Sequence, residues 1–148
     1  MPSLDSLESL RDYVHHLGAK QHDTTGNWSV GQIYFHLAAA FEGSVEGLPA
    51  GYSPLMRFAA RSMRWVVTRI RFPPWLPIPA AIAFKLQPPA EVDIAQQHQR
   101  LVRAIECFAQ HEGDLPAHPV LGKLSRKEWT GFHLRHCKHH LGFITPAK

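Results

Sequence analysis

The sequence predicts an all-α protein, a four-helix bundle interrupted by a long proline-rich crossover. Three observations predict it. Apolar residues recur at helical spacing in several segments, two segments open with a capping-box signature, and no segment shows the strict apolar–polar alternation of a strand. The length of 148 residues fits one domain, 1–148, and an apolar fraction of 45% is ordinary for a folded protein.

The first two helices are predicted from apolar spacing and caps. The first spans about 4–17, where leucines recur at helical spacing, and Ser3 is its expected cap. The second opens at Ser29, whose hydroxyl and the side chain of Gln32 have the spacing of a capping box, and it runs to about Glu46.

Proline and a second capping box divide the rest of the chain. A serine followed by proline opens a third helix, 53–67. The stretch 71–90 is rich in proline and cannot be regular helix throughout, so it is expected to form an apolar crossover. A fourth helix is expected over 91–110, and the sequence SRKE at 125–128 opens the last, 126–143.

Charge, cysteines and hydropathy limit the class of protein. The net charge of +4 is only mildly basic, and no recognised nucleic-acid motif is present. Cys107 and Cys137 form no CxxC pair, so reduced thiols are expected. The N-terminus lacks a secretory pattern, and the most apolar stretch, 73–84, is too short and too proline-rich to cross a bilayer. We therefore expect a cytoplasmic protein with no integral membrane segment and no nucleic-acid partner.

Eleven histidines are unusual for this length, and several gather on the last predicted helix. With Trp129 set at zero on a helical wheel, His136 and His140 fall about 20° to either side, in the middle of the expected core face. Residues four apart on a helix can offer two imidazoles to one ion. A core histidine bonded to a carbonyl is the alternative. His133 could replace either ligand, and His139 lies near the edge of the face.

A third ligand must come from elsewhere, and His36 is the candidate. It lies about 120° from the main apolar stripe of the second helix, on a face completed by the small residues Ala40, Gly43 and Gly47. Small residues allow a neighbouring helix or a ligand to approach closely, so His36 is expected to be buried. Spacing alone leaves a partly exposed histidine as the alternative.

Two stretches resemble a known superfamily. WSVGQIYFHLA (28–38) and HPVLGKLSRKEWTGFHLRHCKHHLGF (118–143) are similar to the signatures of the DinB-like superfamily of metalloenzymes, in a branch labelled a domain of unknown function. The resemblance covers nearly the whole chain. It implies an up-down-down-up bundle, a divalent metal on His36, His136 and His140, and a homodimer. Relatives with known activities include thiol-dependent S-transferases and an isomerase. Many carry glutamine where this chain has Phe143.

Three histidines with an open fourth position are typical of a catalytic metal site. We expect zinc or nickel, with a low-molecular-weight thiol held as a thiolate or a water made nucleophilic, which would make the protein S-transferase-like or hydrolase-like. His118 and His133 are candidate proton shuttles. The substrate is expected to be a small, partly hydrophobic molecule, because the pocket is predicted to be lined by Trp28, Trp129, Phe132 and Phe143 and roofed by Trp75 and Phe84.

Two other functions stay open. The first is a metal-binding or stress-related bundle without turnover, which stays open because Phe143 stands where many relatives carry glutamine. The second is a basic amphipathic surface that binds anionic lipid or nucleic acid. Its residues would be Arg57, Arg61, Arg64, Arg69 and Arg71, beside Met56 and Trp65.

Overall fold

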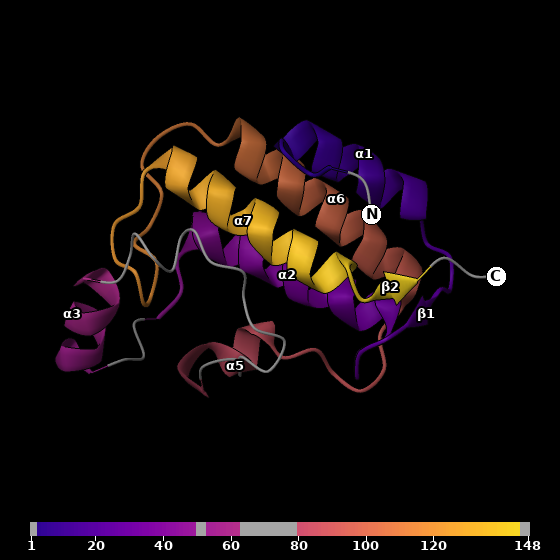
Figure 1. Cartoon of the computed structure of the whole chain (residues 1–148), viewed down its shortest axis with the longest axis horizontal. Helices are drawn as coiled ribbons and strands as arrows, with labels where there is room; N and C mark the ends of the chain where they lie inside the picture. The colour runs from indigo at the N-terminus through magenta and orange to yellow at the C-terminus, as the bar shows by residue number, and fades with distance from the viewer. Residues whose placement is uncertain (1–2, 50–52, 63–79, 146–148) are drawn as a thin grey trace.

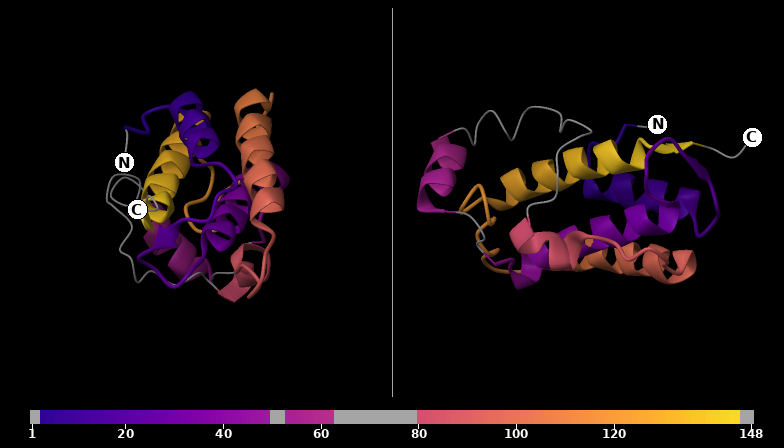
Figure 2. Two further views of the ribbon diagram at one scale, coloured as in Figure 1. Left: turned by 90° about the vertical axis from the view of Figure 1, so that its right-hand side faces the viewer. Right: turned by 90° about the horizontal axis from the view of Figure 1, so that it is seen from below.

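The computed structural model describes residues 3–49, 53–62 and 80–145, and this part of the protein is mostly helical (Figure 1). The helices are α1 (Leu7–Leu17), α2 (Val30–Glu46), α3 (Pro54–Ser62), α5 (Ala80–Leu86), α6 (Ile94–Gln110) and α7 (Arg126–Leu141), and the strands are β1 (Asp23–Thr24) and β2 (Ile144–Thr145). Helices α1, α2, α6 and α7 lie side by side, α5 packs on α2, and α3 lies at one end (Figures 1 and 2).

Both predicted capping boxes are present. The Ser29 amide donates to Gln32 Oε1 at 2.9 Å, and the Gln32 amide donates to Ser29 Oγ at 3.3 Å. Ser125 and Glu128 make the same pair of bonds at the start of α7. The two helices that carry the candidate ligands therefore begin at the residues predicted from the sequence.

Two other helix starts were predicted three residues too early. Helix α1 is capped by Ser6, which exchanges a pair of bonds with Ser9, and not by Ser3. Helix α6 is capped by Asp93, whose carboxylate accepts from the Gln96 amide at 2.7 Å. In α1 both candidates are serines, and the cap is the one that pairs with Ser9; in α6 the aspartate that follows the predicted start supplies the cap.

The remaining boundaries differ less. Helix α7 ends at Leu141, two residues before the predicted end. Helix α3 is present from Pro54, while its predicted continuation to 67 lies outside the described residues. The end of the proline-rich stretch forms the short helix α5, which is compatible with a crossover that is not helical throughout.

A small sheet was missed. Strands β1 and β2 pair antiparallel, with Asp23 opposite Thr145 and Thr24 opposite Ile144. The Thr25 amide adds a bond of 2.9 Å to the carbonyl of Phe143. Strands of two residues are too short to show alternation, so the sequence pattern could not predict them. The pairing joins the segment before α2 to the segment after α7.

The core lies between the four longer helices, and it corrects the predicted face of α7. Apolar side chains from all four are buried there, among them Leu10, Val14, Ile33, Leu37, Phe41, Leu101, Ile105, Phe108 and Leu141. In α7 the buried stripe is Trp129, His133, Cys137 and Leu141. His136 and His140 are only half-buried, so they lie beside this stripe and not in its centre.

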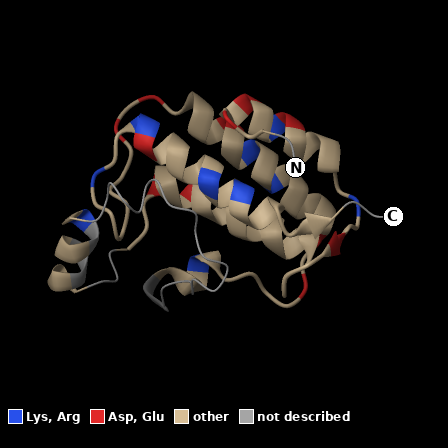
Figure 3. Cartoon of the chain, in the orientation of Figure 1, with Lys and Arg blue, Asp and Glu red and all other residues tan. Residues whose placement is uncertain are grey.

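Lys and Arg residues and Asp and Glu residues both occur along the described helices and loops (Figure 3). Of the predicted basic set, Arg61 is exposed on α3, near Gly122. The side chain of Arg57 and the residues Arg64, Arg69 and Arg71 lie outside what the structure describes. Within the described ranges, no helix is both long and apolar enough to cross a membrane.

Candidate metal centre

The three predicted ligands meet between α2 and α7. His36, His136 and His140 each offer a ring nitrogen, and these atoms lie within 4.8 Å of one another. His36 Nε2 is 3.0 Å from His136 Nε2. The His140 ring centroid lies 4.6 Å from that of His36 and 4.8 Å from that of His136. Two turns of α7 and the middle of α2 therefore place three imidazoles around one point.

A backbone bond sets the orientation of His36. Its Nδ1 lies 2.9 Å from the carbonyl oxygen of Leu86, at the end of α5. A carbonyl oxygen only accepts, so Nδ1 must carry the proton, and in the neutral ring Nε2 presents its lone pair toward His136. Metal-ligating histidines usually hold their other ring nitrogen in this way. The sequence did not indicate this carbonyl as a partner, because a backbone acceptor leaves no residue-type signal.

Burial and the charges of neighbouring histidines favour the neutral form of all three rings. Burial is the main cause that lowers the pKa of His36, and the nearby His139 adds to it. Burial, followed by the charges of His36 and His140, holds the pKa of His136 well below its usual value. Burial and His36 lower the pKa of His140 to about 2. Neutral imidazole is the form that binds a metal, so the three rings are ready to ligate at neutral pH.

Two of the predicted pocket aromatics flank the histidines. The Trp28 ring stacks on His140, with centroids 5.6 Å apart, and lies 4.9 Å from His36. Phe132 lies 5.7 Å from His136. Both rings are half-buried, so they form apolar walls beside the three nitrogen atoms.

The other predicted pocket residues lie elsewhere. Trp129 packs against His118 and His133, in the layer behind the site. Phe143 lies beside His139 and covers Gly26, where an added Cβ would be 3.5 Å from its ring. Phe84 is 71% exposed, and Trp75 is outside the described residues.

His133 is enclosed in the core. It is 1% exposed, and its ring stacks on Phe41 with centroids 3.9 Å apart. Its Nε2 lies 3.0 Å from Ser44 Oγ, and the Ser44 hydroxyl donates to the Phe41 carbonyl, so His133 donates to Ser44. Burial lowers the pKa of His133 to about 3, with a smaller contribution from His118. A role in moving protons stays a prediction.

His118 holds a loop together. Its Nδ1 accepts from the amides of Val120 and Leu121, both at 3.1 Å, and its ring packs between Trp129 and Phe132. Burial lowers the pKa of His118 to about 4. Its suggested role as a proton shuttle likewise stays a prediction. His139, expected at the edge of the face, is half-buried beside His140, with ring centroids 4.7 Å apart.

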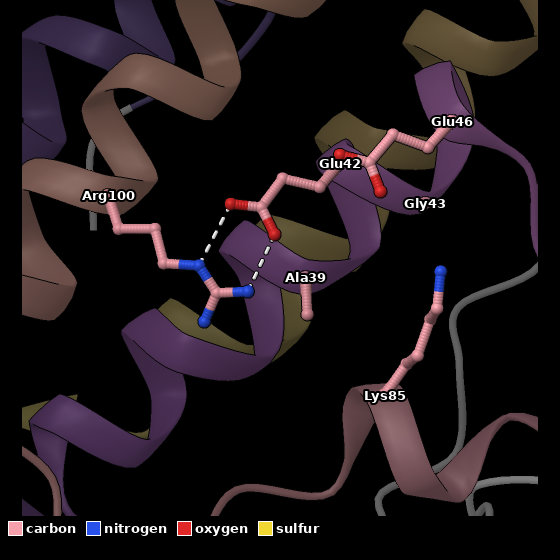
Figure 4. Close-up of a pocket in the computed structure, with 6 residues that line it drawn as sticks. All are labelled: Ala39, Glu42, Gly43, Glu46, Lys85 and Arg100. Atoms are coloured by element: carbon pink, nitrogen blue, oxygen red, sulfur yellow. Dashed lines mark hydrogen bonds and ion pairs between the residues drawn. The ribbon is translucent and has the colours of Figure 1, made fainter.

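A cleft of about 300 Å³ lies between α2, α5 and α6, and no histidine lines it (Figure 4). Arg100 of α6 makes two bonds to the carboxylate of Glu42, at 2.8 and 2.6 Å, and Lys85 of α5 reaches in from the other side. The two cysteines are unpaired, Cys107 exposed and Cys137 buried.

The comparisons with known proteins give a family and no activity. No curated protein and no solved structure matches the chain. One family model, described as a protein of unknown function (DUF1569), matches residues 3–147. Because this match covers nearly the whole chain, the protein belongs to the DUF1569 family of proteins of unknown function.

Proposed function

We propose that this protein is a metal-dependent enzyme whose divalent ion is held by His36, His136 and His140. The observation that carries the proposal is the convergence of three ligand atoms within 4.8 Å, contributed by two helices about a hundred residues apart in sequence. Unlike a single buried histidine, three rings that repel one another when charged gain little by facing the same point unless something binds there.

The donor set fits zinc or nickel. Both accept imidazole nitrogen, and three protein ligands leave a position open for water or a substrate atom. The proton on His36 Nδ1 leaves Nε2 as the ligating atom, and the lowered pKa values keep the other two rings neutral. When bound, the ion would lower the pKa of a water or thiol at the open position and so supply a nucleophile near neutral pH.

The remaining residues of the site would select and position the substrate. Trp28 and Phe132 offer apolar faces on either side of the histidines, which favours a small, partly hydrophobic molecule and limits access of water. Either a low-molecular-weight thiol or a water fits such a site as the attacking group, so the reaction would be S-transferase-like or hydrolase-like.

The proposal extends to the architecture. The order and packing of α1, α2, α6 and α7 support a single DinB-like domain with an up-down-down-up bundle and a crossover between α2 and α6. The resemblance of residues 28–38 and 118–143 to the DinB-like superfamily supports a homodimer, and we propose that the protein is cytoplasmic.

Elemental analysis of protein purified without chelator or affinity resin tests the metal. We expect about one zinc or nickel ion per chain in the wild type. Purified protein, loaded with each metal in turn, is then screened in two assays. The first follows transfer of low-molecular-weight thiols to small electrophiles, and the second follows hydrolysis of activated esters. A wild-type protein that neither carries nor takes up a divalent ion would contradict the proposal.

The alternative is a bundle that binds metal without turnover. Phe143, which stands where many relatives carry glutamine, packs against Gly26 and His139 and has no polar group to offer the site. Stoichiometric metal without acceleration of any thiol–electrophile or ester reaction would favour this alternative over the enzyme.

A further inference from the structure

The later part of the proline-rich crossover, with the two residues after it, runs along α2 in close contact with it. We call residues 82–92 the strap. Leu86 and Ile82 pack on Ala39 and Ala40 in a small apolar cluster apart from the main core. As the strap proceeds toward residue 92, its contacts move toward the start of α2, so the two run antiparallel.

Three contacts fix the strap at the start of α2. Gln32 Nε2 donates to the carbonyls of Pro89 and Ala90, at 2.9 and 3.2 Å. At Gly31 an added Cβ would lie 2.8 Å from Val92 Cγ2, so only glycine lets the two segments approach this closely. One turn further, the Leu86 carbonyl accepts from His36.

The prolines explain why the Leu86 carbonyl is available. In a continuing helix this oxygen would accept from the amide four residues later. Pro88 and Pro89 have no amide hydrogen and stop α5, so the carbonyl at its end needs another donor. His36 Nδ1 is that donor. The local sequence of the strap therefore creates the acceptor that orients a candidate metal ligand.

We infer that the strap positions His36 for metal binding and that Gln32 is the positioning residue that fixes the strap. Gln32 has two roles at once. Its Oε1 accepts from the Ser29 amide to cap α2, and its Nε2 holds the carbonyls that follow α5. This inference rests on the proposed metal site and adds that the affinity of that site depends on residues that never touch the ion.

The variant Gln32→Glu separates the two roles. A carboxylate keeps the acceptor for the Ser29 amide but loses the donor and repels the two carbonyls. We expect zinc affinity, measured by competition with a chromophoric chelator, to fall about tenfold, the lower end of the range for residues that orient ligands. The matched control is Ser29→Ala, which weakens the cap and keeps the bonds to the strap. We expect it to lower the melting temperature and to leave zinc affinity within about twofold.

A second readout does not depend on metal. In zinc-free protein, nitrogen-15 NMR of the histidine rings should show His36 with its proton on Nδ1 and protected from exchange. In Gln32→Glu that signal should weaken, with more of the Nε2–H tautomer. Gly31→Ala, which would push on Val92, should change both readouts in the same direction and by less.

Wild-type zinc affinity in Gln32→Glu, an unchanged His36 signal, or an equal loss of affinity in Ser29→Ala would each overturn the inference. If the wild type binds no zinc or nickel, the proposed function fails, while the His36 signal in the metal-free variants still decides whether the strap orients the ring.

Discussion

Two groups of histidines lie next to each other on α7 and its neighbours, and they differ in what their nitrogen atoms contact. In the inner group, His133 bonds Ser44 and His118 bonds two backbone amides, and aromatic rings pack against both. In the outer group, the rings of His36, His136 and His140 turn nitrogen atoms toward one another. Burial lowers the pKa in both groups. The direction of the nitrogen atoms, and not burial, therefore distinguishes a structural histidine from a candidate ligand.

The largest effect that would sharpen this comparison is expected in His140→Ala. Removing one of three ligands should reduce the bound metal from about one ion per chain to nearly none. The unfolding free energy of the metal-free protein should change by about 1 kcal/mol or less, because the lost ring is neutral and only half-buried. Elemental analysis and urea unfolding measure the two quantities. His139→Ala is the matched control and should keep its metal; loss of metal in the control would contradict the assignment.

His133→Ala is expected to lose stability and to keep its metal, the opposite of His140→Ala. This substitution empties a fully buried site against Phe41 and Trp129 and takes the donor from Ser44, so it should lower the unfolding free energy by about 2–4 kcal/mol. Because its nitrogen atoms do not face the other three rings, folded His133→Ala should bind as much metal as the wild type. A folded variant without metal would mean that the two groups are one site.

A further effect is expected from pH in the metal-free protein. The pKa values of His118 and His133 in the fold, about 4 and about 3, lie below the value of about 6.5 in an unfolded chain. Between these values the unfolded state binds more protons, so stability is full above about pH 6.5 and falls as the pH decreases. Each histidine contributes a slope that rises from about 0.7 kcal/mol per pH unit at pH 6.5 toward about 1.4 kcal/mol per pH unit near pH 5.

Urea unfolding between pH 6.5 and 5, with the metal removed, measures this slope. Replacing His133 with phenylalanine should reduce the slope by the share of one histidine. A stability that does not change over this interval would show that these rings are not kept neutral by the fold.

The sequence predicted where the helices that carry the site begin better than it predicted which face of α7 is buried. The serine caps of α2 and α7 were located to the residue, because a capping box has a fixed spacing and a specific pair of side chains. His36 was a candidate from its small-residue face on α2, and the family resemblance assigned it to the pair on α7, since spacing on one helix says nothing about which residue of another helix it faces.

The helical wheel of α7 was centred about 60° from the observed stripe. The histidines were taken as the centre of the core face, whereas Cys137 and Leu141 lie in the core and the ligands lie at its margin. A wheel gives relative directions only; the position of the neighbouring helices decides which direction is inside. For the same reason, the contact of His36 with a backbone carbonyl of α5 could not be predicted.

The short ladder between β1 and β2 has a consequence for the energetics of metal binding. It ties the residues that lead into α2 to those that leave α7, and Phe143 closes over Gly26 at the same end. Main-chain pairing thus preorganises the helices that bear the imidazoles. Little of the free energy of metal binding would then be lost to ordering the polypeptide. The four paired residues of β1 and β2 can in this way raise the effective concentration of the α7 ligands near the ligand on α2.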